Sequence, residues 1–278
     1  MAPVHKIAVI QLQPEPLAVE ANHARAIQFI RDAAAQGCDL AVLPEYHLTH
    51  WVPEDPGFIP ACADYQKYVE AYRRLAQELQ INIVPGTIVE KHGAQLLNVA
   101  YFISSEGEVL GSYQKKNLWH PERPHLTSSL HEPHEAISTP LGKVGLLICW
   151  DLAFPEAFRA LIASGAQIII IPTFWGLGDC NAEGLAYNPL SEEVFLDSTL
   201  TARCFENTCA VVFANGGDAG LSQVAVPFKG ALGKLQRQEG MSIVELDMRI
   251  IEVAEANYKV REDMGREGWH YEYSLKKA

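Results

Sequence analysis

The sequence has no excess of positive charge and no long apolar run. Its 278 residues carry a formal net charge of −12, so its field repels nucleic acids and anionic membrane surfaces. The most apolar run, Ile168 to Ile171, is far too short to cross a bilayer. The amino-terminal residues lack an apolar stretch and a small-residue cleavage site. We therefore expect a cytoplasmic protein with neither a nucleic-acid nor a membrane partner.

Paired cysteines are missing as well. The six cysteines are spread along the chain without a CxxC pair, which fits neither a disulfide framework nor a zinc site. Four histidines in one stretch invite a metal interpretation, but no Cys or paired carboxylate joins them at a recognised ligand spacing. These are His120, His125, His131 and His134. Histidines beside a cleft are the better interpretation, and we expect neither a metal nor a cofactor.

No linker rich in Pro, Gly or Ser divides the chain, and 48% hydrophobic with 20% charged residues suits one globular domain over residues 1–278. Apolar runs of strand length alternate with amphipathic helical stretches. In the first half we expect strands at Lys6–Gln11, Asp39–Leu43, Ile83–Val89, Leu97–Ile103 and Val109–Lys115, and helices at about 20–35 and at Asp64–Leu79.

The second half is predicted to repeat this order. We expect strands at Val144–Cys149, Ile168–Ile171, Ala210–Ala214, Ser222–Val226 and Ser242–Asp247, and helices at Pro155–Ser164, Glu192–Glu206 and Ile251–Lys259. Two similar halves predict an α/β fold, a four-layer α-β-β-α sandwich of two mixed sheets packed face to face with outer helices. The tail from about Gly265 carries Trp269, Tyr271 and Tyr273. It packs either on a second subunit or on the chain's own surface.

Three residues with reactive side chains stand at the ends of apolar strands. Cys149 ends one strand, Glu45 follows another, and Lys115 ends a third. The carboxyl ends of strands are where open α/β folds build their sites. Each residue alone has an ordinary interpretation: a buried core thiol, a solvated loop carboxylate and an edge lysine. Because strand side chains alternate, Tyr113 and Lys115 are expected to point to one face of the strand and Lys116 to the other.

The segments around these residues resemble the nitrilase superfamily, also called the carbon–nitrogen hydrolases. The order and spacing match in LAVLPEY with Glu45, GSYQKKNL with Lys115 and GLLICWDLAFPE with Cys149, and KIAVIQLQP, PGTIVE and TARCFENTCAVVFANGG are similar too. The resemblance covers nearly the whole chain. It implies a Glu–Lys–Cys catalytic set, a homodimer or larger homo-oligomer, and a second glutamate. Glu122 is the closest match for that glutamate, with Glu132 and Glu135 as alternatives.

The chemistry of these residue types agrees with that implication. A thiol with a pKa of about 8.5 is only partly ionised at neutral pH, so Cys149 needs a base, and Glu45 can supply one. The resemblance implies that Lys115 and the backbone N–H of Trp150 stabilise the oxyanion. It also implies that Glu122 positions the water that hydrolyses the resulting thioester.

The substrate stays open between a small amide, an N-carbamoyl compound and a nitrile, and the acyl acceptor between water and an amine. In the nitrilase branch the residue after the Trp is usually Glu, so Asp151 favours an amidase or carbamoyl amidohydrolase. Trp119, Phe174, Trp175 and Tyr187 are predicted to line the substrate cavity. The resemblance assigns the catalytic lysine to Lys115, which implies that Tyr113, on the same face, also points into the cleft. A non-catalytic binding protein would have lost the nucleophile or the base, and neither is lost. A redox enzyme would need a resolving cysteine, and none is near in sequence.

Overall fold

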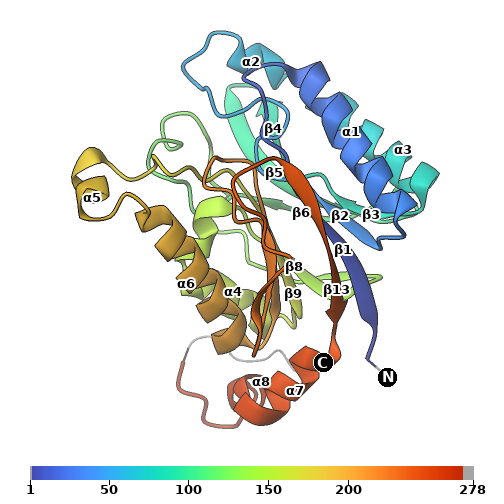
Figure 1. The fold of residues 1–278 in the computed structure, drawn as a ribbon, viewed down its shortest axis with the longest axis vertical. Coiled ribbons are helices and arrows are strands. Elements are labelled where there is room, and N and C mark those ends of the chain that lie inside the picture. The colour runs from blue at the N-terminus through green and yellow to red at the C-terminus, as the bar shows by residue number, and fades with distance from the viewer. Residues whose placement is uncertain (1, 272–278) are drawn as a thin grey trace.

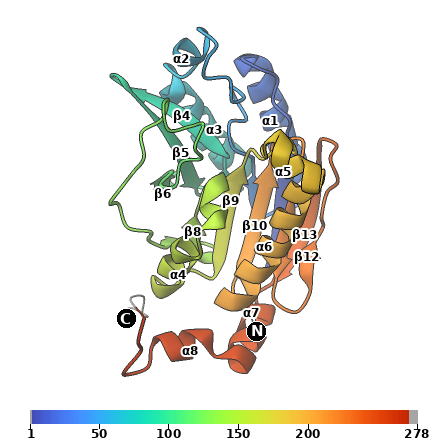
Figure 2. The ribbon, with the colours of Figure 1, turned by 90° about the vertical axis from the view of Figure 1, so that its left-hand side faces the viewer.

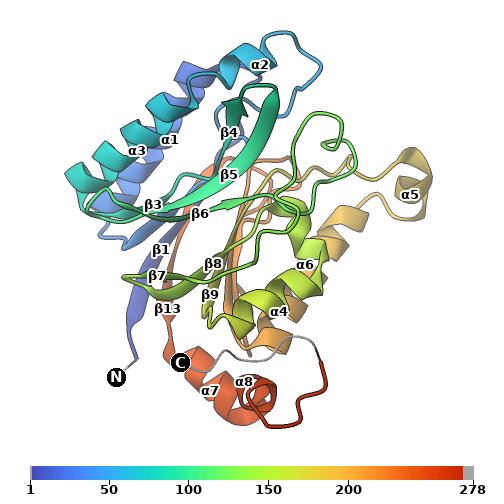
Figure 3. The same cartoon turned by 180° about the vertical axis from the view of Figure 1, so that it is seen from behind.

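The computed structural model describes residues 2–271, which form four layers (Figure 1). Two sheets pack face to face. Helices α1 (Val19–Ala35) and α3 (Tyr65–Leu79) cover the outer face of the first sheet, and α4 (Pro155–Ala163) and α6 (Ser191–Asn207) cover that of the second (Figures 2 and 3). The α-β-β-α sandwich predicted from the sequence is therefore confirmed.

The first sheet contains seven strands in the order β13-β1-β2-β3-β5-β4, with β6 paired to β5. The parallel strands β1, β2 and β3 form its centre, and the others add antiparallel pairs, which makes the sheet mixed. The strands are β1 (Val4–Gln11), β2 (Leu40–Val42), β3 (Asn82–Val84), β4 (Thr87–His92), β5 (Gln95–Ile103), β6 (Val109–Gln114) and β13 (Gly240–Asp247).

The second sheet contains six strands in the order β12-β11-β10-β9-β8-β7, of which β8, β9 and β10 are parallel. Its strands are β7 (Ile137–Thr139), β8 (Gly142–Leu146), β9 (Ile168–Thr173), β10 (Ala210–Asn215), β11 (Gln223–Val226) and β12 (Gly230–Leu232). The remaining elements are α2 (Phe58–Ala61), the 3-10 turn η1 (Cys149–Ala153), α5 (Ala182–Tyr187), α7 (Arg249–Tyr258) and α8 (Val260–Met264).

The strand periodicity explains how the core divides. In β1, Ile7 and Val9 belong to the large apolar cluster that fills the space between the sheets and continues beneath α4 and α6. Ala8 and Ile10 belong to a second cluster beneath α1 and α3. Successive side chains of a strand point to opposite faces, so one strand feeds both clusters. The central strand β9 is buried along its whole length because both of its faces are covered.

Two expectations about strands were wrong. The strand predicted at Ser242–Asp247 does not close the second half, because β13 lies antiparallel to β1 in the first sheet. Periodicity reveals a strand but not its partner, and β13 covers the hydrogen-bonding edge that β1 would otherwise expose.

The strand predicted at Ile83–Val89 is two strands separated by Pro85 and Gly86. Gly86 has φ +65°, and a Cβ there would lie 1.8 Å from the carbonyl oxygen of Pro44. Only glycine fits this turn, which presses against the residue that precedes Glu45. The turn therefore helps to fix the position of Glu45.

The carboxyl-terminal segment packs partly on its own chain. Trp269 lies half-buried against the large cluster, and Tyr271 is exposed. Tyr273 lies outside the described residues. Across residues 2–271, no helix has both the length and the apolar character needed to cross a membrane.

Candidate active site

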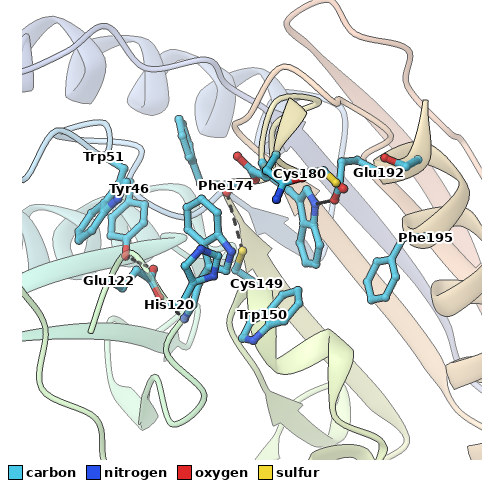
Figure 4. Close-up of a pocket in the computed structure, with 15 residues that line it drawn as sticks. Tyr46, Trp51, His120, Glu122, Cys149, Trp150, Phe174, Cys180, Glu192 and Phe195 are labelled. Atoms are coloured by element: carbon cyan, nitrogen blue, oxygen red, sulfur yellow. Dashed lines mark hydrogen bonds between the residues drawn. The ribbon is translucent and has the colours of Figure 1, made fainter. Parts of the chain in front are cut away.

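A cavity of about 570 Å³ lies beyond the carboxyl ends of β2, β8 and β9 (Figure 4). The segment after β2 supplies Tyr46, the turn after β8 supplies Cys149 and Trp150, and the segment after β9 supplies Phe174 and Trp175. The other lining residues are Trp51, Trp119, His120, Glu122, Asp179, Cys180, Asn181, Ser191, Glu192 and Phe195. The cavity therefore lies between the two halves of the fold.

Cys149 begins η1 with φ +45°, a left-handed conformation that costs a residue with a side chain about 1–2 kcal/mol. The carboxylate of Asp151 holds this turn. It accepts hydrogen bonds from the Ile148 N–H at 2.9 Å, from the Tyr113 hydroxyl at 2.9 Å and from the side chain of Asn117 at 2.8 Å. The thiol is only 7% exposed and lies 3.8 Å from the carbonyl oxygen of Phe174.

Glu45 is fully buried and held by donors from both halves of the chain. Its Oε1 accepts hydrogen bonds from Asn98 Nδ2 and Lys115 Nζ, each at 2.8 Å. Its Oε2 accepts one from the Phe174 N–H at 2.9 Å, and its own N–H donates to the Thr173 carbonyl oxygen at 3.2 Å. These contacts fix both carboxylate oxygens beside the cavity.

Lys115 lies between two carboxylates and is fully buried. Its Nζ is 2.8 Å from Glu45 Oε1 and 2.6 Å from Glu122 Oε1. Lys116 points elsewhere, and its Nζ donates to the carbonyl oxygen of Glu132. Of the two adjacent lysines, Lys115 is the one that reaches the cluster.

Glu122 is the glutamate that joins this cluster. Besides Lys115 Nζ, it accepts hydrogen bonds from the Tyr46 hydroxyl and, at 2.8 Å, from the Trp119 N–H. Glu132 and Glu135 line a different hollow, next to β6 and β7. Of the three glutamates named from the sequence, Glu122 is therefore the one in contact with Lys115.

Burial and charge set the protonation states of the cluster. Burial raises the pKa of Glu45 to about 7, against the opposing effect of Lys115 and with a further rise caused by Glu122. Burial, then the Glu45 carboxylate, raises the pKa of the Cys149 thiol well above its usual range. Burial alone would lower the pKa of Lys115, but Glu122 and Glu45 raise it above its ordinary value. At neutral pH the thiol is therefore protonated and the lysine is charged. Glu45 is present both as the carboxylate and as the carboxylic acid, because its pKa is about 7.

The predicted aromatic residues divide into two groups. Trp119, Trp150, Phe174 and Trp175 line the cavity. Tyr113 and Tyr187 do not, so their expected places beside the substrate are wrong. The Tyr113 hydroxyl instead donates to Asp151 in η1, and Tyr187 is exposed in α5.

Other residues of the site were not predicted from the sequence. Tyr46 directly follows Glu45 and could have been noticed there. Asn98 lies within β5, while Glu192 and Phe195 lie in α6, far from the other site residues in sequence. No local pattern marks these three, because only the folded chain brings them to the cavity.

The four histidines do not form a cluster. His120 lines the cavity, His125 faces Glu54, and His134 packs against the ring of Tyr113. In the part of the chain that the structure describes, no group of three or more His, Cys, Asp or Glu side chains could hold a metal ion.

Comparison with known proteins identifies the family. The chain is 28% identical to an (R)-stereoselective amidase from Pseudomonas sp., over 93% of this chain and 90% of that protein. It is also 28% identical to the deaminated glutathione amidase of Bos taurus, over 88% of this chain and 77% of that protein. The crystal structure of an amidase from Nesterenkonia sp. matches with a TM-score of 0.74 and 25% identity, over 92% of this chain and 95% of that one.

These relatives confirm the resemblance to the nitrilase superfamily. A family model described as carbon-nitrogen hydrolase matches residues 6–255, most of the chain. The chain therefore belongs to the carbon–nitrogen hydrolase family and is an enzyme that acts on carbon–nitrogen bonds other than peptide bonds.

Proposed function

We propose that the enzyme hydrolyses a small amide to a carboxylic acid and ammonia through a thioester on Cys149. The observation that supports this most is the meeting of a thiol, a carboxylate of near-neutral pKa and a buried ammonium at one cavity. Cys149 lines the cavity, and Glu45 and Lys115, from two other strand ends, lie buried next to its wall, where Glu45 bonds to Phe174. The second carboxylate, Glu122, completes the cluster.

In the first step the Cys149 sulfur attacks the amide carbon. A proton must leave the thiol, because its raised pKa keeps it protonated at neutral pH. Glu45 takes this proton and then gives it to the departing nitrogen as the C–N bond breaks. Ammonia leaves, and the acyl group remains on sulfur.

The negative charge that develops on the carbonyl oxygen needs donors. An ammonium group has three N–H bonds, and Lys115 directs two of them to Glu45 and Glu122. The third is free to serve the oxyanion, together with the backbone N–H of Trp150 that follows the nucleophile. The two carboxylates hold Lys115 in place before substrate arrives.

In the second step water attacks the thioester. Glu45 accepts a proton from that water, the C–S bond breaks, and the sulfur regains a proton as the acid departs. Glu122 holds Lys115 and Tyr46 through short hydrogen bonds. In this position it also offers an acceptor to the attacking water.

Relatives favour an amide over a nitrile. The Nesterenkonia amidase has been crystallised with butyramide in a cysteine-to-alanine variant, and with acrylamide in a double variant that also replaces a glutamate by glutamine. The Pseudomonas and bovine relatives are also named as amidases. We therefore infer that a primary aliphatic amide is the first substrate class to test.

The test compares butyramide, butyronitrile and N-carbamoyl-β-alanine by ammonia release. Intact-protein mass spectrometry of acid-quenched reactions measures the acyl adduct on Cys149. We expect ammonia and an adduct from the amide in the parent enzyme and in Cys209→Ala, and neither in Cys149→Ala. Turnover of the nitrile but not the amide would contradict the proposal, as would undiminished hydrolysis by Cys149→Ala.

A further inference from the structure

The cavity has a second acidic region, on the side of Cys149 away from the catalytic cluster. Glu192 and Phe195 lie on that side, whereas Glu122 and Tyr46 lie on the other (Figure 4). Asp179 also lines the cavity. This region belongs to the same cavity as the thiol, so a substrate that Cys149 attacks can extend into it.

These two carboxylates have no cationic partner. Neither Asp179 nor Glu192 forms an ion pair with another residue among 2–271, and the cavity lining contains no Lys or Arg. The contrast with the catalytic end is direct, because Lys115 there forms an ion pair with both Glu45 and Glu122. The far end therefore keeps an uncompensated negative charge.

Both carboxylates are nevertheless held in place. The indole N–H of Trp175 donates to Glu192 Oε2 at 2.6 Å, and the Gly176 N–H donates to Asp179 Oδ2 at 2.9 Å. Burial raises the pKa of Asp179 to about 6, with further contributions from Glu192, Asp218 and Glu122. The carboxylates of Asp179 and Glu192 repel each other, but their hydrogen bonds hold them in place. A positively charged group between them would relieve this repulsion.

The surrounding rings add to this preference. Trp175 and Phe195 stack with centroids 5.3 Å apart, and Trp150 lies 5.5 Å from Trp175. The faces of aromatic rings are negative and attract ammonium and guanidinium groups. A cavity of about 570 Å³ also has room for more than the amide group itself.

We propose that the substrate is a cationic amide, in which an alkyl chain joins the scissile amide to an ammonium or guanidinium group held by Asp179 and Glu192. This inference rests on the proposed amide hydrolysis. It goes further in naming the charge of the substrate. It excludes amides that carry a carboxylate at the same position, because like charges in a partly desolvated site repel strongly.

Three amides of similar length test the charge directly: 5-aminopentanamide is cationic, pentanamide neutral and glutaramate anionic. Turnover of each by the parent enzyme is measured as kcat/KM. Affinity is measured separately in Cys149→Ala by ligand-detected NMR, so that binding is scored even without hydrolysis. We expect the cation to exceed the neutral amide by about tenfold in both measurements, and the anion to fall below the neutral amide.

Variants locate the effect. Glu192→Gln and Asp179→Asn should each reduce the ratio of cationic to neutral amide several-fold, and Glu192→Lys should move the preference toward glutaramate. Glu183→Gln is the matched control, because it removes one exposed charge from α5 outside the cavity lining. Its ratio should equal that of the parent enzyme.

The outcomes separate the two proposals. Absence of amide turnover, with cation-selective binding to Cys149→Ala, would contradict the proposed reaction and support the cation site. Hydrolysis of all three amides with equal kcat/KM, or a preference for glutaramate, would overturn the cation site and leave amide hydrolysis standing. A ratio that falls equally in Glu183→Gln would also overturn it, since the effect would then come from net charge alone.

Discussion

The carboxylates at the two ends of the cavity differ in whether a cation is bound to them. At one end Glu45 and Glu122 share the ammonium of Lys115, and all three side chains are fully buried or nearly so. At the other end Asp179 and Glu192 are partly exposed and receive only neutral N–H donors. Glu45 and Glu122 have a cationic partner before any ligand binds, whereas Asp179 and Glu192 would receive one only from a bound ligand. We therefore expect the first end to set the rate for every substrate and the second to set the choice among substrates.

Cys149→Ala should have the largest effect, because it removes the only atom proposed to bond to substrate. We expect turnover to fall by at least about 10⁴-fold, as for other nucleophiles. Alanine keeps the small size of the residue in η1, so the thermal midpoint should change little. Measurements of kcat and of thermal unfolding check both points. Cys204→Ala, which alters a buried thiol in α6, serves as the control and should stay active.

Glu45→Gln removes the proton carrier while keeping the side-chain size, and should cost about 10²–10⁴-fold in kcat. The parent enzyme should also lose activity below about pH 7. The pKa of Glu45 is raised to about 7, so the active carboxylate is protonated as the pH falls through that value. A pH–rate profile on a neutral amide measures this.

In the Glu45→Gln profile the acidic fall should disappear. An unchanged acidic limb in that variant would assign it to another group and contradict the role of Glu45.

Lys115→Gln should lose about 10²–10³-fold in kcat, because one oxyanion donor is removed. It should also destabilise the protein by about 3–5 kcal/mol, since Glu45 and Glu122 would lose their shared cation while buried. Chemical denaturation at pH 8 measures the second effect. The adjacent Lys116→Gln is the control, as that side chain donates to a loop carbonyl oxygen at the surface, away from the buried cluster. Equal losses in both variants would show that the positive charge acts diffusely.

Tyr113→Phe should have the smallest effect. It removes one of the donors to Asp151, so we expect a loss of about 1 kcal/mol in stability and less than about tenfold in kcat. KM for butyramide should stay the same, because Tyr113 does not line the cavity. A raised KM with unchanged kcat would instead mean that Tyr113 contacts the substrate.

The strand ends were the part of the site that the sequence predicted well. Apolar strands followed by Glu45, Lys115 and Cys149 could be recognised one by one. Their meeting could not, because β2 and β6 belong to one sheet and β8 to the other, and the packing of the two sheets brings the three residues together. The layers followed from the alternation of strands and helices. Both inferences rest on the order of residues within single strands and helices, which does not depend on how these elements pack.

Other features of the site depend on packing between elements that are distant in sequence. Nothing near Asn98 or Glu192 indicates a site, since each reaches the cavity through packing of an element distant in sequence. The direction of Tyr113 was wrong because strand alternation fixes the face of a side chain but not where its far end goes. The turn at Pro85 and Gly86 was visible in the sequence as a turn signal, yet its contact with Pro44 was not.

The pairing of β1 with β13 has a consequence for how the enzyme is made. Val4 lies opposite Asp247, so β1 is synthesised long before its partner strand β13. At about 5–20 residues per second, that interval is on the order of ten to fifty seconds. Throughout it, β1 has an open edge and the sheet that carries Glu45 is incomplete. The growing chain is thus exposed to wrong strand pairing until β13 is synthesised, so the first sheet cannot be completed before most of the second half has been made.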